Sequence, residues 1–91
     1  MENQTSERFH DYGVCELHKV ELDNNCLRYY RIEIVPGLFS PIVSRFWGRI
    51  GRAPRCKEDF FESLEDGIRA ANRLYRRKRS RGYREIGMWG L

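Results

Sequence analysis

A tryptophan between two arginines is the pattern in this sequence that best suggests chemistry. Arg45, Trp47 and Arg49 alternate along one stretch, and alternate residues of a β-strand lie on the same face of a sheet. An indole ring between guanidinium groups can stack on a base or a sugar and hold phosphate. The same alternation also permits a structural role, in which Trp47 packs under a helix and the arginines surround it.

Basic residues are concentrated around and after this stretch. Between Arg45 and Arg84 there are thirteen basic and five acidic residues, whereas the rest of the chain has four basic and eight acidic. This asymmetry favours a basic face and an anionic partner, although arginines at a helix end also interact favourably with the helix dipole. The candidate nucleic-acid-binding residues are Trp47, Arg49, Arg45, Arg52, Arg55, Lys78, Arg79 and Arg81.

The other reactive residue types lack the spacing that catalysis or metal binding needs. His10 lies in a polar segment, His18 lies in an expected strand, and motifs such as HExxH, GxSxG or a P-loop are absent from the sequence. The three cysteines are odd in number and widely spaced, which favours reduced thiols in a cytoplasmic protein over disulfides or a zinc site. We therefore expect no catalytic residue, no metal, no cofactor and no small-molecule substrate.

These residues must be positioned by strands that precede a single long helix. Segments Val14–Leu22 and Leu27–Val35 are rich in β-forming residues and flank a polar turn, which predicts a hairpin. Segment Ile42–Gly51 alternates again, and Arg55–Phe61 is a weaker strand candidate because charges interrupt it.

The alternation within the third strand defines two faces. We assign Phe46 and Ile50 to the core, which puts Trp47 and Arg49 on the opposite and more accessible face. The connection before this strand contains Leu38 and Phe39, and it is apolar enough that we expect it to pack down onto the sheet.

The helix is marked at both ends. Ser63 is a good N-cap with Asp66 three residues later, and Gly82 follows a basic last turn. Its apolar stripe consists of Leu64, Ile68, Ala71, Leu74 and Tyr75. The element order predicts an α+β fold in which an antiparallel sheet of about four strands packs against one long C-terminal helix.

A chain of 91 residues is expected to form a single domain. We predict a flexible arm over 1–12, a folded domain over 13–84, and a tail over 85–91 that docks on the core through Trp89. The sequence has no transmembrane run and no secretory signal, which fits a soluble cytoplasmic protein with no membrane partner.

The signature Trp47-Gly48-Arg49, followed by Ile50-Gly51, resembles that of the WGR domain family. The resemblance extends over about residues 14 to 84 and is closest to small stand-alone bacterial members. It rests in addition on Arg28-Tyr29-Tyr30-Arg31-Ile32, Leu38-Phe39, Phe61, Ser63, Ala70, Leu74-Tyr75, Lys78 and Gly82-Tyr83. Two features depart from the family pattern. The turn after the signature, residues 52–55, lacks the usual glycine, and Gly67 stands where the family usually has alanine.

The resemblance implies a small twisted antiparallel sheet against one long helix, and it implies a role. In poly(ADP-ribose) polymerases the WGR domain contacts DNA near a strand break, with its signature Trp beside a terminal nucleotide. By position, only Trp47 and Arg49 inherit those roles. The leading hypothesis is a non-catalytic module that binds DNA ends or nicks. The alternative is a protein-interaction or regulatory module that offers the same surface to an acidic protein partner.

Overall fold

The structure, a computed structural model, describes residues 7–91. Its strands are β1 (Gly13–Glu21), β2 (Cys26–Pro36), β3 (Pro41–Arg49), β4 (Arg55–Phe60) and β5 (Arg84–Gly90). A short 3-10 turn, η2 (Leu22–Asn24), joins β1 to β2, and the helix α1 (Leu64–Ser80) lies between β4 and β5 in the chain. The predicted α+β fold is confirmed, with five strands instead of about four.

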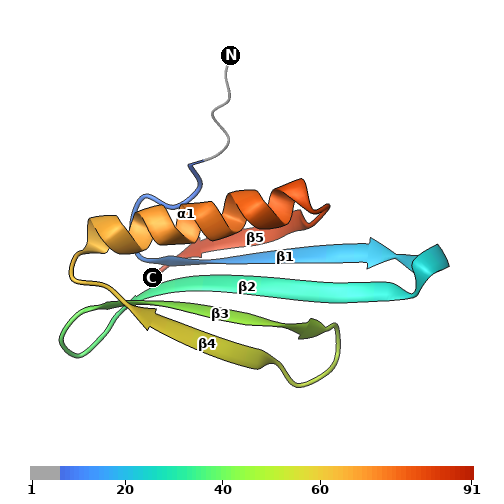
Figure 1. The fold of residues 1–91 in the computed structure, drawn as a ribbon, viewed down its shortest axis with the longest axis horizontal. Coiled ribbons are helices and arrows are strands. Elements are labelled where there is room, and N and C mark those ends of the chain that lie inside the picture. Colours follow the sequence, from blue (N-terminus) through green and yellow to red (C-terminus); the bar gives the residue numbers. More distant parts are fainter. Residues whose placement is uncertain (1–6) are drawn as a thin grey trace, which may run out of the picture.

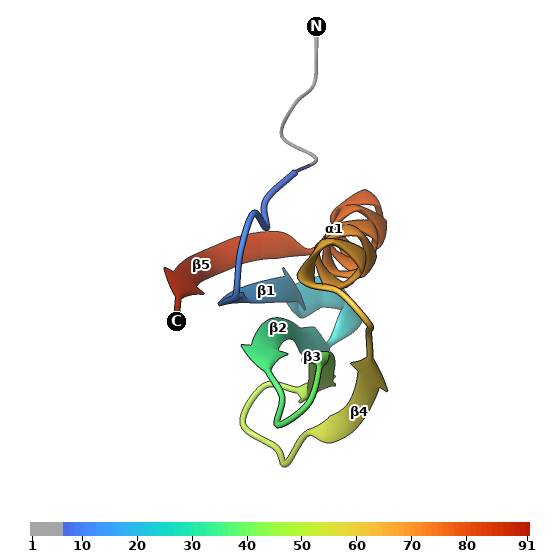
Figure 2. The same cartoon turned by 90° about the vertical axis from the view of Figure 1, so that its left-hand side faces the viewer.

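All neighbouring strands are antiparallel, in the order β4-β3-β2-β1-β5. The sheet curves around one side of α1 (Figures 1 and 2), and α1 contacts β2 and β3. The fifth strand is the segment that we predicted to be a tail over 85–91. It pairs with β1, where Trp89 lies opposite Val14 and remains 51% exposed. The prediction of a tail was therefore wrong. Two glycines in this short terminal segment weaken the residue pattern that marks a strand, so the sequence did not reveal β5.

The register between β2 and β3 decides which side of β3 faces the helix. The buried residues Tyr30, Ile32 and Ile34 of β2 lie opposite Trp47, Arg45 and Val43, respectively. Directly opposed residues share a face, so the odd-numbered residues of β3 lie on the core side. Our assignment of Phe46 and Ile50 to the core was therefore wrong. Alternation separates the two faces of a strand but does not say which one the helix covers.

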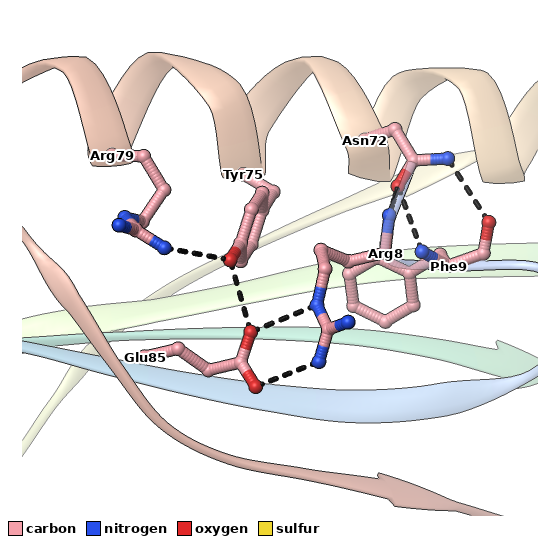
Figure 3. Close-up of polar contacts among 6 residues, drawn as sticks. All are labelled: Arg8, Phe9, Asn72, Tyr75, Arg79 and Glu85. Atoms are coloured by element: carbon pink, nitrogen blue, oxygen red, sulfur yellow. Dashed lines mark hydrogen bonds and ion pairs between the residues drawn. The ribbon is translucent and has the colours of Figure 1, made fainter. Parts of the chain in front are cut away.

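Part of the predicted arm is packed on the domain. The side chain of Phe9 is 0% exposed and belongs to the core. The Oδ1 atom of the buried Asn72 accepts hydrogen bonds from the backbone N–H groups of Arg8 (3.0 Å) and Phe9 (2.8 Å), as Figure 3 shows. An arm over 1–12 is therefore wrong from Arg8 onward, and residues 1–6 lie outside the described residues. Two aromatic residues, Phe9 and Tyr12, in an otherwise polar segment give no periodicity from which this docking could be predicted.

The β2–β3 connection projects away from the sheet instead of packing on it. The side chains of Leu38 and Phe39 are 89% and 94% exposed, so the predicted packing was wrong. The backbone N–H of Gly37 donates to the carbonyl oxygen of Ser40 at 3.0 Å. That closure makes the connection a tight turn, and its tip is too short to fold back over the strands.

The helix ends lie where the capping residues predict. The Oγ atom of Ser63 accepts a hydrogen bond from the backbone N–H of Asp66 at 3.1 Å. Gly82 has a φ of 95°, and the backbone N–H of Tyr83 donates to the carbonyl oxygen of Lys78 at 3.1 Å. This is the hydrogen bond of a Schellman C-cap, and it brings Tyr83 back beside Lys78. No helix in the described part of the chain is long and apolar enough to span a membrane.

Candidate nucleic-acid interface

Trp47 is half-buried at the edge of the core, where it belongs to a row of aromatic rings. Its ring centroid lies 6.5 Å from that of Tyr30, with an interplanar angle of 30°. Tyr30 in turn lies 6.3 Å from Tyr83 in an edge-to-face arrangement at 69°. Trp47 therefore combines the two roles that the sequence left open, because it packs on the core and also lines two surface hollows described below.

Lys78 lies over this row from the last turn of α1. Its Nζ atom is 4.4 Å from the Tyr30 ring centroid and 5.3 Å from that of Tyr83, which is cation–π geometry. Burial lowers the pKa of Lys78, and nearby arginines, Arg81 first among them, lower it further. Within residues 7–91, no carboxylate forms an ion pair with this ammonium group.

Two hollows flank Trp47, and both include Lys78. The larger hollow has a volume of about 430 Å³, and the smaller hollow has a volume of about 160 Å³. The larger hollow is lined by Arg28, Trp47, Gly48, Arg49, Lys78 and Tyr83. The smaller hollow is lined by Tyr30, Arg45, Trp47 and Lys78. Each hollow therefore combines an aromatic surface with at least two cations, which suits a ligand that has both a ring and negative charge.

Arg45 reaches the smaller hollow with its hydrogen-bonding capacity partly unused. Its Nε atom is buried and has no partner among the described residues. Its nearest carboxylate, that of Asp59, lies 3.7 Å from Nη2, too far for a good hydrogen bond. Burial raises the pKa of Tyr30, and the neighbouring Arg45 opposes that rise. A buried donor without a partner is costly, so this group favours an acceptor supplied by a ligand.

Arg49 lines the larger hollow and is also attached to the turn between β1 and β2. It donates to the carbonyl oxygen of Asn25 at 3.2 Å and to its Oδ1 atom at 3.0 Å. Asn25 can adopt the required left-handed conformation, with a φ of 53°. The turn thus holds the guanidinium group beside Trp47 without neutralising its charge.

Arg79 lies on the other side of the helix end from Trp47. It donates to the hydroxyl of Tyr75 at 3.1 Å, and that hydroxyl donates to the carboxylate of Glu85 at 2.9 Å. Arg8 forms a bidentate ion pair with the same carboxylate (Figure 3). These contacts lower the pKa of Glu85 although its burial acts to raise it. Arg79 therefore belongs to a structural network that joins the N-terminal segment, α1 and β5.

The remaining predicted residues lie around the hollows without lining them. Arg55 is opposite Trp47 in the β3–β4 register and so shares its face. Arg52 is exposed in the turn between these strands, and Arg81 is exposed at the helix C-cap. The sequence analysis missed Arg28 and Tyr83, which do line the larger hollow. Arg28 lies opposite Arg49, so a predicted β2–β3 register would have been the signal that found it.

The two faces of the sheet differ in charge. We call the face that carries Trp47 the helix-side face. The strand register and side-chain alternation place these charged residues of β1 to β4 on it: Lys19, Glu21, Arg28, Arg45, Arg49, Arg55, Lys57 and Asp59. The opposite face of β1 to β4 carries Glu16, His18, Arg31, Glu33 and Glu58. The helix-side face is therefore strongly basic, and the basic end of α1 adds to it.

Among the described residues, no cysteine, histidine, aspartate or glutamate lines either hollow beside Trp47. The Cys15 thiol is fully buried, and burial raises its pKa to about 12, so it stays protonated. His18 lies 2.9 Å from a carboxylate oxygen of Glu16, and neither residue lines a hollow beside Trp47. Among residues 7–91 there is no group of three or more His, Cys, Asp or Glu that could hold a metal ion. The arrangement is suited to binding an anion and stacking on a ring.

Comparison with known proteins agrees with the signature around Trp47. A search of curated proteins found no match, and a search of solved structures found no match. The family model of the WGR domain matches residues 13–88, which is nearly the whole chain and includes β5. This family is consistent with nucleic-acid binding in general. On this match and on the fold described above, the chain belongs to the WGR domain family.

Proposed function

We propose that this chain is a non-catalytic module that binds DNA ends or nicks through the helix-side face, with Trp47 at the centre of the site. The observation that carries the proposal is the set of cations that surrounds this ring, three of which, Lys78, Arg28 and Arg49, have no carboxylate ion-pair partner among the described residues. Lys78, Arg28 and Arg49 border the larger hollow, and Arg45 borders the smaller one. Bringing these like charges together is unfavourable by itself, so a polyanion would relieve a repulsion that the folded chain maintains.

The recessed position of Trp47 favours ends over intact duplex. Its ring is half-buried between the sheet and α1, so only a nucleotide that can enter the hollow reaches it. Bases inside a duplex are stacked on their neighbours, and exposing one costs a few kcal/mol. A terminal or nick-flanking nucleotide has lost one neighbour, and its sugar and base are open to stacking on an aromatic ring.

The test is a binding panel of labelled blunt, nicked, single-stranded and covalently closed DNA with wild type, Trp47→Ala and Trp89→Ala. Stacking on an aromatic ring is worth about 1–3 kcal/mol per base. We therefore expect Trp47→Ala to weaken binding to ends and nicks by roughly five- to a hundredfold. Trp89→Ala is the matched control, because Trp89 lies on β5 away from both hollows, and it should bind as wild type does.

Two outcomes would count against the proposal. The first is that Trp47→Ala remains folded in a melting experiment and binds DNA ends normally. The second is that covalently closed DNA binds as tightly as nicked DNA. In the first case the acidic-protein alternative becomes preferable, and a polyglutamate peptide titrated against wild type and Trp47→Ala would test it directly.

A further inference from the structure

The position of Trp47 between two cationic hollows indicates more than a single anion site. The larger hollow offers Arg28 and Arg49, the smaller hollow offers Arg45, and Lys78 lines both. One phosphate needs only one such hollow. A ligand that satisfies both must carry two negative groups separated by a unit that can lie against the indole ring.

A nucleotide with a phosphate on each side of its sugar has this arrangement. We propose that the site recognises a 3′,5′-bisphosphorylated nucleotide unit, as a strand offers wherever a nucleotide has lost a stacking neighbour, rather than one phosphate alone. The sugar or base lies against Trp47, one phosphate occupies the larger hollow and the other occupies the smaller hollow. This inference rests on the proposed function, because it takes a nucleic-acid strand as the source of the unit.

The smaller hollow has the properties that a second phosphate site requires. Its volume of about 160 Å³ greatly exceeds the roughly 10–15 Å³ that a single water needs. The Nε atom of Arg45 is buried without a partner in the described chain, so this guanidinium keeps one donor for a ligand besides its ion pair with Asp59 and its interaction with Tyr30. A phosphate oxygen is the acceptor that suits its planar arrangement of donors.

Lys78 is placed to serve both phosphates. Its ammonium group lies over Tyr30, which lines the smaller hollow, and faces Tyr83, which lines the larger one. An ammonium group is a point charge with three donors, so it can bridge two anions. Burial and four neighbouring arginines disfavour its charged form, and two phosphates would reverse that effect.

The test uses thymidine 3′,5′-bisphosphate, each thymidine monophosphate, and a thymidine pentanucleotide without terminal phosphates. The chain has two tryptophans, so a Trp89→Phe background makes Trp47 fluorescence the reporter. We expect the bisphosphate to bind about tenfold or more tightly than either monophosphate, because the second charged contact is added without a second loss of freedom. The pentanucleotide, whose internal nucleotides carry both phosphates, should bind at least as tightly as the bisphosphate.

Variants assign the two hollows. Arg45→Gln and Arg28→Gln should each lower the affinity for the bisphosphate to about that for a monophosphate. One variant should keep its affinity for the 3′-monophosphate and the other its affinity for the 5′-monophosphate. Arg31→Gln is the control, because it changes an exposed arginine of the same strand as Arg28 on the opposite face, and it should leave every affinity unchanged.

Three results would overturn the inference. The panel of blunt, nicked, single-stranded and covalently closed DNA described above tests the proposed function separately. The first is a bisphosphate that binds no more tightly than the better monophosphate, and the second is an Arg45→Gln variant that keeps the full bisphosphate advantage. Either would show that one phosphate is recognised, while binding to DNA ends could stand. The third is that the bisphosphate quenches Trp47 fluorescence and the pentanucleotide does not. That result would exclude a nucleic-acid strand as the source of the bisphosphorylated unit.

Discussion

Trp47 contributes to stability and to the candidate site through different parts of one side chain. Its contact with Tyr30 connects it to the core, and its remaining surface lines both hollows. An alanine at this position therefore removes packing as well as stacking. For this reason every binding measurement on Trp47→Ala must be paired with a melting curve, and the effects of Arg45 and Arg49 variants are easier to interpret.

At Arg49, the tether to Asn25 can be separated from ligand binding. Asn25→Gly keeps the left-handed backbone, because glycine adopts positive φ readily, but removes the Oδ1 acceptor of Arg49. A net hydrogen bond is worth about 0.5–1.5 kcal/mol, so we expect DNA-end binding roughly two- to tenfold weaker because Arg49 is less ordered. Arg49→Lys keeps the charge and loses the planar fork, and it should weaken binding at least as much. Titration of both variants with nicked DNA checks this, and wild-type affinity in both would mean that Arg49 has only a structural role.

Residue types and spacing predicted the centre of the site better than its boundary. Trp47, Arg45, Arg49 and Lys78 were all candidates from the sequence, and the fold brings them together. Arg79 was misplaced because two neighbouring residues of a helix point about 100° apart, which is enough to turn it toward Tyr75 and Glu85 instead. The participation of Arg28 depends on strand register, which no local pattern gives.

The helix α1 contains one residue that lowers its stability without an evident structural need. Gly67 is buried at the end of its first turn, and a Cβ added there would meet Val43 at 3.5 Å and Ile34 and Phe61 at 3.9 Å, which are ordinary contacts. Glycine in a helix interior costs about 0.8–1.0 kcal/mol relative to alanine. We therefore expect Gly67→Ala to raise the unfolding free energy by about 1 kcal/mol, measured by urea denaturation followed by circular dichroism.

Gly82 provides the matched control for that measurement. It also borders α1, but its φ of 95° places it in the left-handed region, so Gly82→Ala should destabilise the domain by about 1 kcal/mol or more. A loss of stability in Gly67→Ala would mean that the methyl group does not fit between α1 and the sheet. The DNA affinity of Gly67→Ala should be unchanged, because Gly67 lies far along α1 from Lys78.

Elements with a strong local signal were predicted, and those that depend on long-range pairing were not. The hairpin of β1 and β2 and both ends of α1 follow from turn and capping residues. β5 and the docked segment around Phe9 are short, and each is stabilised by partners more than 60 residues away in the chain, such as Asn72 for Phe9. Their formation depends on tertiary contacts that a sequence window does not contain.

At the scale of the whole molecule, the sheet separates charge between its faces. In β1 to β4 the helix-side face carries six basic residues with Glu21 and Asp59, whereas the opposite face carries three glutamates, His18 and Arg31. Charge asymmetry along the sequence predicted a basic face, but only the strand register shows that Arg45, Arg49, Arg55 and Lys57 share it with Lys19 and Arg28. Such a surface orients the domain toward a polyanion and speeds the encounter at low salt.

This separation of charge leads to a prediction about ionic strength. Each phosphate that a basic residue neutralises releases condensed counterions, and the logarithm of affinity falls with the logarithm of salt by about 0.9 per contact on duplex DNA. Three to five contacts from the helix-side face imply a slope of about −3 to −5. Lys57→Gln should reduce the magnitude of that slope by about 1 if Lys57 contacts a phosphate, because it shares that face through its pairing with Arg45. Arg31→Gln, on the opposite face, should leave the slope unchanged. Titrations of nicked DNA at several salt concentrations measure all three slopes.

A flat salt dependence of the wild-type affinity would rule out phosphate contacts as the basis of binding. An equal change of slope in both variants would show that net charge, rather than one face, determines the affinity.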